Sequence, residues 1–264
     1  MNARTIKVEK ILSSIVGSYN YYTVLSDFFE MSAISIRNAV DYSPARKEYE
    51  ERYLRTIKKY PENERNKFSE ALGAFITLIS ESINKKTFYD WAGEMYMNSQ
   101  TSSKCFGQFF TPYEISKFMS MLTIDCKNFA GKIQQDRNYI ISLNEPTCGA
   151  GGIIVAAMEV LYNQGINYSW NTFVDCTDID ARCVHMTYLT LSLLGVPAIV
   201  RLGNSLTMEY RETWYTPALI LAESHFVGQL KKQNSQKECV ALPKNDYNEI
   251  KFKVEKNGQC AFIF

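Results

Sequence analysis

A glycine-rich segment carries the strongest chemical signal in the sequence. It reads Leu143-Asn-Glu-Pro-Thr-Cys-Gly-Ala-Gly-Gly152, and it lies between a β-rich run and an apolar helical run. Glycines let the backbone turn sharply and let a ligand approach where a Cβ would stand in the way. Such a loop between a strand and a helix is typical of a nucleotide-like ligand site. The alternative is a tight turn that binds nothing.

Two nucleotide motifs are excluded at this loop. A G-x-G-x-x-G pattern fails because residue 154 is Ile154, and a P-loop fails because no Gly-Lys-Ser/Thr follows. The glycine spacing therefore argues against a nicotinamide oxidoreductase.

Polar side chains follow the next two predicted strands. Asp178 lies two residues after the run Thr172–Cys176, and an acid at this point can accept hydrogen bonds from both hydroxyls of a ribose. Asp180 precedes a helical run, so we expect it to be the N-cap of that helix. Asn204, in Leu202-Gly-Asn-Ser-Leu206, ends the third strand, and its side chain would lie near a bound adenine ring.

A fourth segment lies upstream and reads Gly107-Gln-Phe-Phe-Thr-Pro-Tyr-Glu-Ile115. Pro112 suits the first turn of a helix, and Thr111 suits its cap. Free backbone N–H groups at this helix start would hold a carboxylate. The alternative is an ordinary capped helix.

The elements that must position these residues change character near Cys105. Residues 1–104 predict a helical N-terminal region, with amphipathic runs at 45–60, 64–84 and 88–97. Residues 105–264 predict an α/β domain, because strands at 139–143, 172–176 and 198–202 alternate with helices at 153–163 and 181–194. This alternation is the signature of a parallel, doubly wound sheet.

Composition narrows the class of protein. The chain has 264 residues with a net charge of +1, so a strongly basic nucleic-acid-binding chain is excluded as a whole. Seven cysteines form no CxxC pair, and only two histidines are present, so we expect no metal site. No apolar run is long enough to span a membrane, and no signal peptide is recognisable. We expect a cytoplasmic protein with free thiols.

Taken in order, GQFFTP, EPTCGAGG, TDID and GNSL resemble the N6-adenine DNA methyltransferases, and most of all the modification subunit of type I restriction systems. The stretch Asp90-Trp-Ala-Gly-Glu-Met-Tyr96 also resembles this family. The resemblance implies a Rossmann-like S-adenosylmethionine-dependent methyltransferase sheet, with S-adenosyl-L-methionine as cofactor. It further implies DNA as substrate and a separate specificity or restriction subunit as partner. The implied cofactor-binding residues are Gln108, Phe109, Phe110, Thr111, Pro112, Glu145, Thr147, Gly149, Ala150, Gly151, Gly152, Asp178, Ile179 and Asn204.

The sequence departs from the family at its catalytic motif, Asn/Asp-Pro-Pro-Tyr/Phe, because it contains no Pro-Pro. The best alignment reads Ala218–Ala222 as the strand before that motif, which places Glu223 at the catalytic amide or acid and Phe226 at the aromatic that stacks on the flipped base. The alternative is a core strand and a turn with no catalytic role. Glu145 also replaces the family's usual Asp. The residues after Leu206 are fewer than a methyltransferase sheet and a target recognition region usually need, so we expect a shortened or stand-alone relative.

Two functions therefore stay open. The first is an adenine-specific DNA methyltransferase. The second is a catalytically impaired module that binds cofactor, DNA or both and modulates a partner. A methyltransferase acting on RNA or protein is a weaker third reading, because the loops that choose the substrate carry no recognisable signal.

Overall fold

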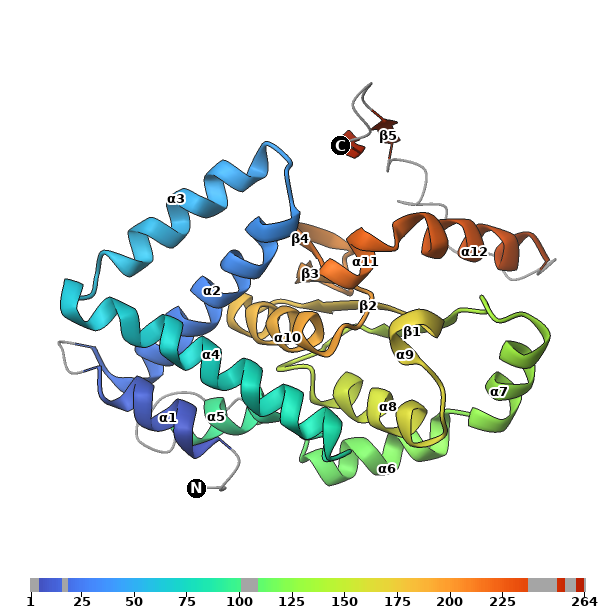
Figure 1. Ribbon diagram of the computed structural model, residues 1–264, viewed down its shortest axis with the longest axis horizontal. Coiled ribbons are helices and arrows are strands. Elements are labelled where there is room, and N and C mark those ends of the chain that lie inside the picture. Colours follow the sequence, from blue (N-terminus) through green and yellow to red (C-terminus); the bar gives the residue numbers. More distant parts are fainter. Residues whose placement is uncertain (1–4, 16–18, 101–108, 237–250, 255–259, 264) are drawn as a thin grey trace.

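The computed structural model describes residues 5–15, 19–100, 109–236, 251–254 and 260–263. Its helices are α1 (Ile6–Ser13), α2 (Tyr21–Val40), α3 (Ala45–Ile57), α4 (Glu62–Asn84), α5 (Trp91–Gln100), α6 (Tyr113–Thr123), α7 (Cys126–Gln135), α8 (Gly152–Asn163), α9 (Tyr168–Asn171), α10 (Ala181–Leu194), α11 (Pro217–Leu221) and α12 (Glu223–Gln236). Its strands are β1 (Ile141–Glu145), β2 (Thr172–Asp178), β3 (Ala198–Asn204), β4 (Glu209–Tyr215), β5 (Lys251–Val254) and β6 (Cys260–Ile263). The chain is thus an α/β protein with a helical N-terminal region (Figure 1).

The elements predicted from sequence periodicity are confirmed with small shifts of their ends. The run at 181–194 forms α10, which begins at its N-cap Asp180 and ends at Gly195, a left-handed residue with φ of +69°. A glycine is favoured there because other residues are strained at positive φ. The three predicted strands form β1, β2 and β3, and each extends two residues further toward its carboxyl end.

The four-stranded sheet has the order β1-β2-β3-β4. The first three strands are parallel, with Glu145 opposite Cys176 and Asp178 opposite Leu202. The fourth strand returns antiparallel to β3. The carboxyl ends of β1, β2 and β3 therefore meet at one edge of the sheet, as a doubly wound arrangement requires of a ligand site.

Neighbouring residues on each central strand enter different cores, because side chains on a strand alternate between the two faces. Val174 and Val200 join the main core, which α8 and α10 cover. Phe173 and Ile199 join a second core on the other face. The second core consists of Ile140, Phe173, Ile199, Leu219 and Phe226. Figure 1 shows α11 and α12 on this second side of the sheet and α8 and α10 on the first.

A side chain from α12 closes the start of the β1 edge. Within the described residues β1 pairs only with β2. The N–H of Ile140 donates to Oε1 of Gln233 at 3.0 Å, and Nε2 of Gln233 donates to the Ile140 carbonyl at 3.1 Å. One amide side chain thus satisfies both backbone groups that a neighbouring strand would otherwise satisfy.

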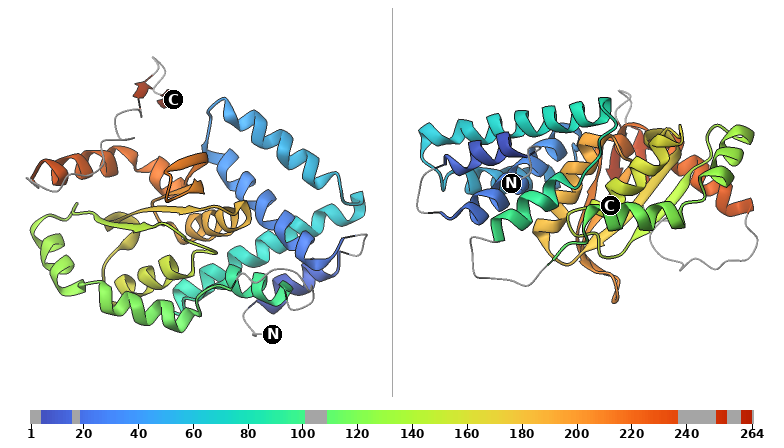
Figure 2. Two further views of the ribbon diagram at one scale, coloured as in Figure 1. Left: turned by 180° about the vertical axis from the view of Figure 1, so that it is seen from behind. Right: turned by 90° about the horizontal axis from the view of Figure 1, so that it is seen from below.

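The helical N-terminal region shares the main core with the sheet. Phe28 and Phe75 are buried in the same cluster as Leu189 of α10 and Trp214 of β4. Figure 2 shows α1, α2, α4 and α5 gathered at one end of the molecule, with α7 and α12 at the other. The shared core means that α10 is covered by the sheet on one side and by N-terminal helices on the other.

A polar network joins the same two parts of the chain. Arg52 of α3 forms ion pairs with Glu30 of α2 and with Glu212 of β4, the latter at 3.1 Å. Its Nη2 also donates to Nε2 of His185 at 3.2 Å, since a guanidinium has no acceptor. Burial lowers the pKa of His185 to about 3, so this imidazole is neutral at pH 7 and free to accept. The indole Nε1 of Trp214 donates to Glu212 at 3.0 Å.

We expect Arg52→Ala to lower the free energy of unfolding by about 3 kcal/mol, because two partly buried carboxylates lose their cation. The matched control is Lys85→Ala, which breaks an exposed ion pair with Glu81 and should leave the free energy of unfolding almost unchanged. Urea unfolding followed by circular dichroism measures both values. Equal losses in the two variants would show that the Arg52 network does not join the helices to the sheet.

Candidate ligand site at the carboxyl edge of the sheet

The glycine loop after β1 is held in a defined conformation by its own backbone. Gly149 and Gly151 have φ of +55° and +89°, a region that side-chain-bearing residues rarely adopt. The N–H of Cys148 donates to the Thr177 carbonyl of β2 at 2.9 Å, and the N–H of Gly151 donates to the Cys148 carbonyl at 2.8 Å. The loop therefore follows the end of β2 closely before α8 begins.

The carboxylate of Asp178 fastens this loop to the end of β2. One oxygen accepts from the N–H of Gly149 at 2.9 Å, and the other accepts from the N–H of Asp180 at 2.9 Å. The side chain is 8% exposed. A carboxylate oxygen has two lone-pair sites, so each oxygen keeps one that can accept from a ligand hydroxyl. The predicted contact with a ribose stays a prediction.

Asp180 is the N-cap of α10, which confirms the sequence prediction. Its carboxylate accepts from the N–H of Arg182 at 2.9 Å and pairs with the Arg182 guanidinium. Burial and the neighbouring Asp178 raise the pKa of Asp180, whereas the N–H of Arg182 lowers it. The two acids after β2 thus have separate tasks, one at the loop and one at the helix.

The upstream Phe-Thr-Pro segment reaches the glycine loop through Phe110. A Cβ added at Gly149 would lie 3.0 Å from Cδ1 of Phe110, so the ring rests against the loop backbone. The ring of Phe110 also lies 5.3 Å from that of Tyr96 on α5. Phe109 is 79% exposed, and Gln108 lies outside the described residues.

The predicted cap at Thr111 is wrong. Helix α6 has Pro112 as its N-cap, and no side chain caps its first turn. The carbonyl of Pro112 accepts from the N–H groups of Ile115 and Ser116, and Thr111 and Pro112 are exposed. The N–H groups of the first turn therefore have no side-chain acceptor from Thr111.

Several other predicted contact residues are engaged within the protein. The carboxylate of Glu145 accepts from the N–H of Thr147 at 3.0 Å and from its hydroxyl at 3.3 Å. Ala150 is 2% exposed, so only its backbone is a candidate for ligand contact. Glu145 and Thr147 form a small turn at the mouth of the loop, and Gly152 begins α8.

Asn204 closes a turn with the oxygen that was expected near an adenine ring. Its Oδ1 accepts from the N–H of Leu206 at 2.9 Å and from that of Thr207 at 3.4 Å. Ile179 is 65% exposed beside the site, and Arg211 of β4 donates to its carbonyl at 3.1 Å. The contact of Asn204 with adenine stays a prediction that would need the amide N–H₂ group, because both lone pairs of Oδ1 are engaged.

The strand predicted at 218–222 is wrong, because Pro217–Leu221 forms α11 and Glu223–Gln236 forms α12. Phe226 is fully buried in the second core, beside residues at the amino ends of the strands. Burial raises the pKa of Glu223 to about 7. The structure therefore does not bring Glu223 and Phe226 to the glycine loop, which lies at the carboxyl ends, and the buried Phe226 ring has no free face for a base.

One residue of the site was missed from the sequence. The hydroxyl of Thr187 on α10 donates to the Gly149 carbonyl at 2.9 Å. A Cβ added at Gly151 would lie 3.1 Å from the hydroxyl oxygen of Thr187. Thr187 stands seven residues after the cap Asp180, which places both on one face of α10. That spacing is the only signal the sequence offered, and many structural threonines share it.

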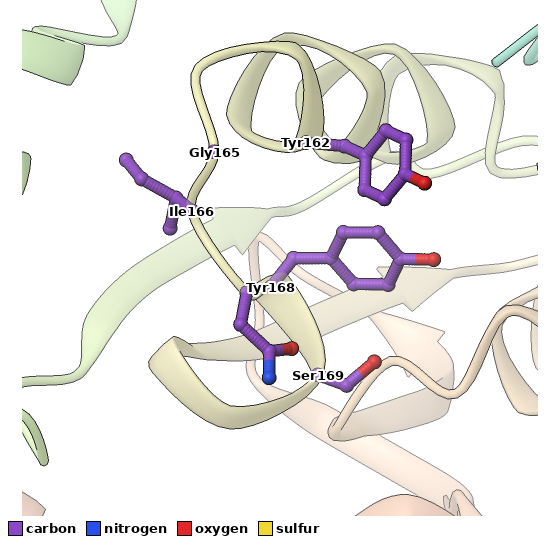
Figure 3. Close-up of a pocket in the computed structure, with 6 residues that line it drawn as sticks. Tyr162, Gly165, Ile166, Tyr168 and Ser169 are labelled. Atoms are coloured by element: carbon purple, nitrogen blue, oxygen red, sulfur yellow. The ribbon is translucent and has the colours of Figure 1, made fainter.

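A cavity of about 290 Å³ lies elsewhere, between the end of α8 and α9. Figure 3 shows the rings of Tyr162 and Tyr168 facing each other on one side of it. Because α9 leads directly into β2, this cavity lies toward the amino ends of the strands. It does not overlap the glycine loop. We therefore place the candidate site by the strand ends and the loop contacts rather than by this cavity.

Two kinds of feature are absent from the described part of the chain. No helix in it is long and apolar enough to cross a membrane. No group of three or more histidine, cysteine, aspartate or glutamate side chains in it is arranged to hold a metal ion.

Comparison with known proteins settles the family. The N-6 DNA methylase family matches residues 87–264, which is more than half of the chain. The chain belongs to the N-6 DNA methylase family. The match begins within the helical N-terminal region, between α4 and α5, so the family segment includes Tyr96 as well as Phe110. The resemblance stated from the four sequence segments is therefore confirmed.

Solved structures in the comparison match at low identity. One chain, assigned to the class I S-adenosylmethionine-dependent methyltransferases, is from Listeria monocytogenes; it has a TM-score of 0.41 and 13% identity, covering 78% of this chain and 55% of that one. Another is a type I restriction-modification system methyltransferase subunit from Streptococcus thermophilus, with a TM-score of 0.38 and 12% identity, covering 79% of this chain and 59% of that one. This N-6 DNA methylase family member thus spans less than two thirds of either chain. No curated protein matches it.

We expect Asp178→Ala to lower the free energy of unfolding by about 1–3 kcal/mol, because the N–H groups of Gly149 and Asp180 lose their acceptor. Chemical denaturation measures the change. The control is Asp125→Ala, which removes an exposed cap from α7 and should cost about 1 kcal/mol or less. A smaller loss at Asp178 than at Asp125 would mean that the loop does not depend on this carboxylate.

Proposed function

We propose that the protein binds S-adenosyl-L-methionine at the glycine loop and transfers its methyl group to the exocyclic amine of adenine in DNA. One observation carries the proposal. In a chain of the N-6 DNA methylase family, the loop with Gly149, the acid Asp178 and the ring of Phe110 meet at the carboxyl edge of a parallel sheet. That is where doubly wound sheets bind their ligands.

The residues at this edge fit such a cofactor. Left-handed glycines leave the backbone open to close approach, and Asp178 keeps two lone pairs for ribose hydroxyls. Ile179 and Phe109 are large apolar side chains that are 65% and 79% exposed, and such surface favours contact with a purine ring. The residues proposed to contact the cofactor are Gln108, Phe109, Phe110, Thr111, Pro112, Glu145, Thr147, Gly149, Ala150, Gly151, Gly152, Asp178, Ile179 and Asn204.

Methyl transfer requires the protein to align the adenine amine with the methyl group and to polarise that amine, and it needs no nucleophile from the protein. When bound, the cofactor supplies a methyl group activated on a sulfonium. The adenine amine is a poor nucleophile because its lone pair is delocalised into the ring. The protein must therefore hold the amine in line with the methyl group and accept its N–H bonds. We assign no such role to Glu223 or Phe226, because they lie at the other end of the sheet.

A second function is supported by a specific observation. The sequence contains no Pro-Pro, and the segment aligned to the catalytic motif is helical. A module that binds cofactor or DNA without methyl transfer, and that modulates a partner such as a specificity or restriction subunit, is consistent with both facts. In either function we propose that residues 1–104 are the helical region and residues 105–264 are the methyltransferase-like domain.

We expect titration calorimetry to show binding of S-adenosyl-L-methionine that Asp178→Ala weakens by about 1–3 kcal/mol, since ribose hydroxyls would lose their acceptor. Asp125→Ala should bind like the wild type. The affinities are compared at a temperature where each variant is folded. An unchanged affinity in Asp178→Ala would remove this acid from the site, and absence of binding in the wild type would end the proposal.

Methyl transfer separates the two functions. The assay adds cofactor with a tritiated methyl group to unmethylated DNA, and to RNA and protein as alternative acceptors. Label at the adenine amine of DNA would support the methyltransferase and reject the module. Cofactor binding without label on any acceptor would support the module instead.

A further inference from the structure

A buried acid outside the proposed contact set lies against the glycine loop. Asp90 immediately precedes α5 and is 7% exposed. Its Oδ1 accepts from the N–H of Gly93 at 2.9 Å, which is the bond that an N-cap side chain makes to the third residue of a helix. This contact alone would explain Asp90 as an ordinary cap of α5.

The other oxygen of Asp90 faces the start of α8. A Cβ added at Gly152 would lie 2.6 Å from Oδ2 of Asp90 and 3.0 Å from its Cγ. Real Cβ atoms do not approach other heavy atoms so closely, so any side chain at Gly152 would have to displace the acid. Gly152 has no positive φ, unlike Gly149 and Gly151. Its lack of a side chain is therefore explained by Asp90 and not by backbone conformation.

The surroundings of Asp90 act on its charge in opposite directions. The N-terminal turns of α5 and α8 both lie beside the carboxylate, and helix N-termini carry partial positive charge. The charged or titratable neighbours are Glu94 on α5 and Tyr113 on α6. Burial, with a smaller contribution from Glu94, raises the pKa of Asp90 to about 6, whereas the N–H of Gly93 lowers it. The hydroxyl of Tyr113 donates to Glu159 of α8 at 2.8 Å, which joins α6 to the same helix.

We propose that Asp90 is the positioning residue of the glycine loop: its side chain fills the space beside Gly152 and fixes the first turn of α8 against α5. Residues 145–152 end in that turn, so a shift of Gly152 moves the backbone proposed to hold the cofactor. This inference rests on the proposed cofactor site. It assigns the helical N-terminal region an indirect part in binding, because Asp90 and α5 belong to that region and act through the glycine loop.

The test is a double-mutant cycle with two readouts. The variants are Asp90→Ala, Gly152→Ala and the two combined, with Gly73→Ala in α4 as control, since a Cβ there meets nothing within 4 Å. Calorimetry gives the affinity for S-adenosyl-L-methionine. Hydrogen exchange by mass spectrometry gives the protection of the loop amides without any ligand.

We expect Gly152→Ala and Asp90→Ala each to weaken binding by about tenfold or more, and the combined variant to recover to within about threefold of the wild type. Recovery follows because the alanine methyl at 152 enters the space that the acid has left. Asp90→Asn keeps the shape and the acceptor for Gly93, so it should also stay within about threefold. Hydrogen exchange of the loop amides should become faster in Asp90→Ala and in Gly152→Ala, and it should return to the wild-type rate in the combined variant.

Two results would overturn the assignment: single losses that simply multiply in the combined variant, or an Asp90→Asn loss as large as that of Asp90→Ala. A wild type that binds no S-adenosyl-L-methionine would refute the proposed function alone. The exchange data on the free protein would still decide whether Asp90 fixes the loop, because they need no cofactor.

Discussion

The carboxylate of Asp178 is the interaction on which the candidate site depends. It accepts one backbone N–H from the glycine loop and one from the turn before α10. Two segments that are far apart in the chain are therefore held at the same strand end by one buried side chain. The hydroxyl of Thr187 donates to the carbonyl of Gly149, which is the other backbone group of that residue. Both backbone groups of Gly149 are therefore engaged by side chains of the protein itself.

The N-terminal helices belong to this arrangement rather than standing apart from it. The main core runs from Val8 to Trp214 without a break between the two parts of the chain. Arg52 adds a polar connection from α3 to β4 and α10. Helix α10 carries both Asp180 and Thr187, so forces that fix α10 also fix the site. A polar network can contribute to such specificity because each of its members is satisfied only in one packing.

Local signals made the part of the chain that forms the sheet predictable. The consecutive apolar residues Phe173 and Val174 indicate a strand that is buried on both faces. Asp180 and Gly195 indicate the two ends of a helix, because their residue types suit an N-cap and a left-handed C-cap. The prediction of a strand and a motif at 218–226 is wrong, because the alignment to the family pattern relied on the apolar run Ala218–Ala222, which fits a buried strand as well as a helix. Pro217 at the first helical position was the available signal for a helix. Strand β4 is polar and owes its structure to pairing with β3, which sequence periodicity does not encode. Contacts such as Asp90 with Gly152 depend on tertiary packing, so no local pattern reveals them.

The amide of Gln233 has a consequence for dividing the chain in the laboratory. It supplies the donor and the acceptor that Ile140 needs, and Phe226 from the same helix covers Phe173 and Ile199. An expression fragment that stops after Tyr215 would expose the apolar side chains on one face of the sheet. It would also remove the side-chain partner of the Ile140 backbone N–H and carbonyl, where β1 begins. Such a fragment would be prone to aggregate, so crystallisation trials or isotope labelling should retain α12 as an integral wall of the sheet.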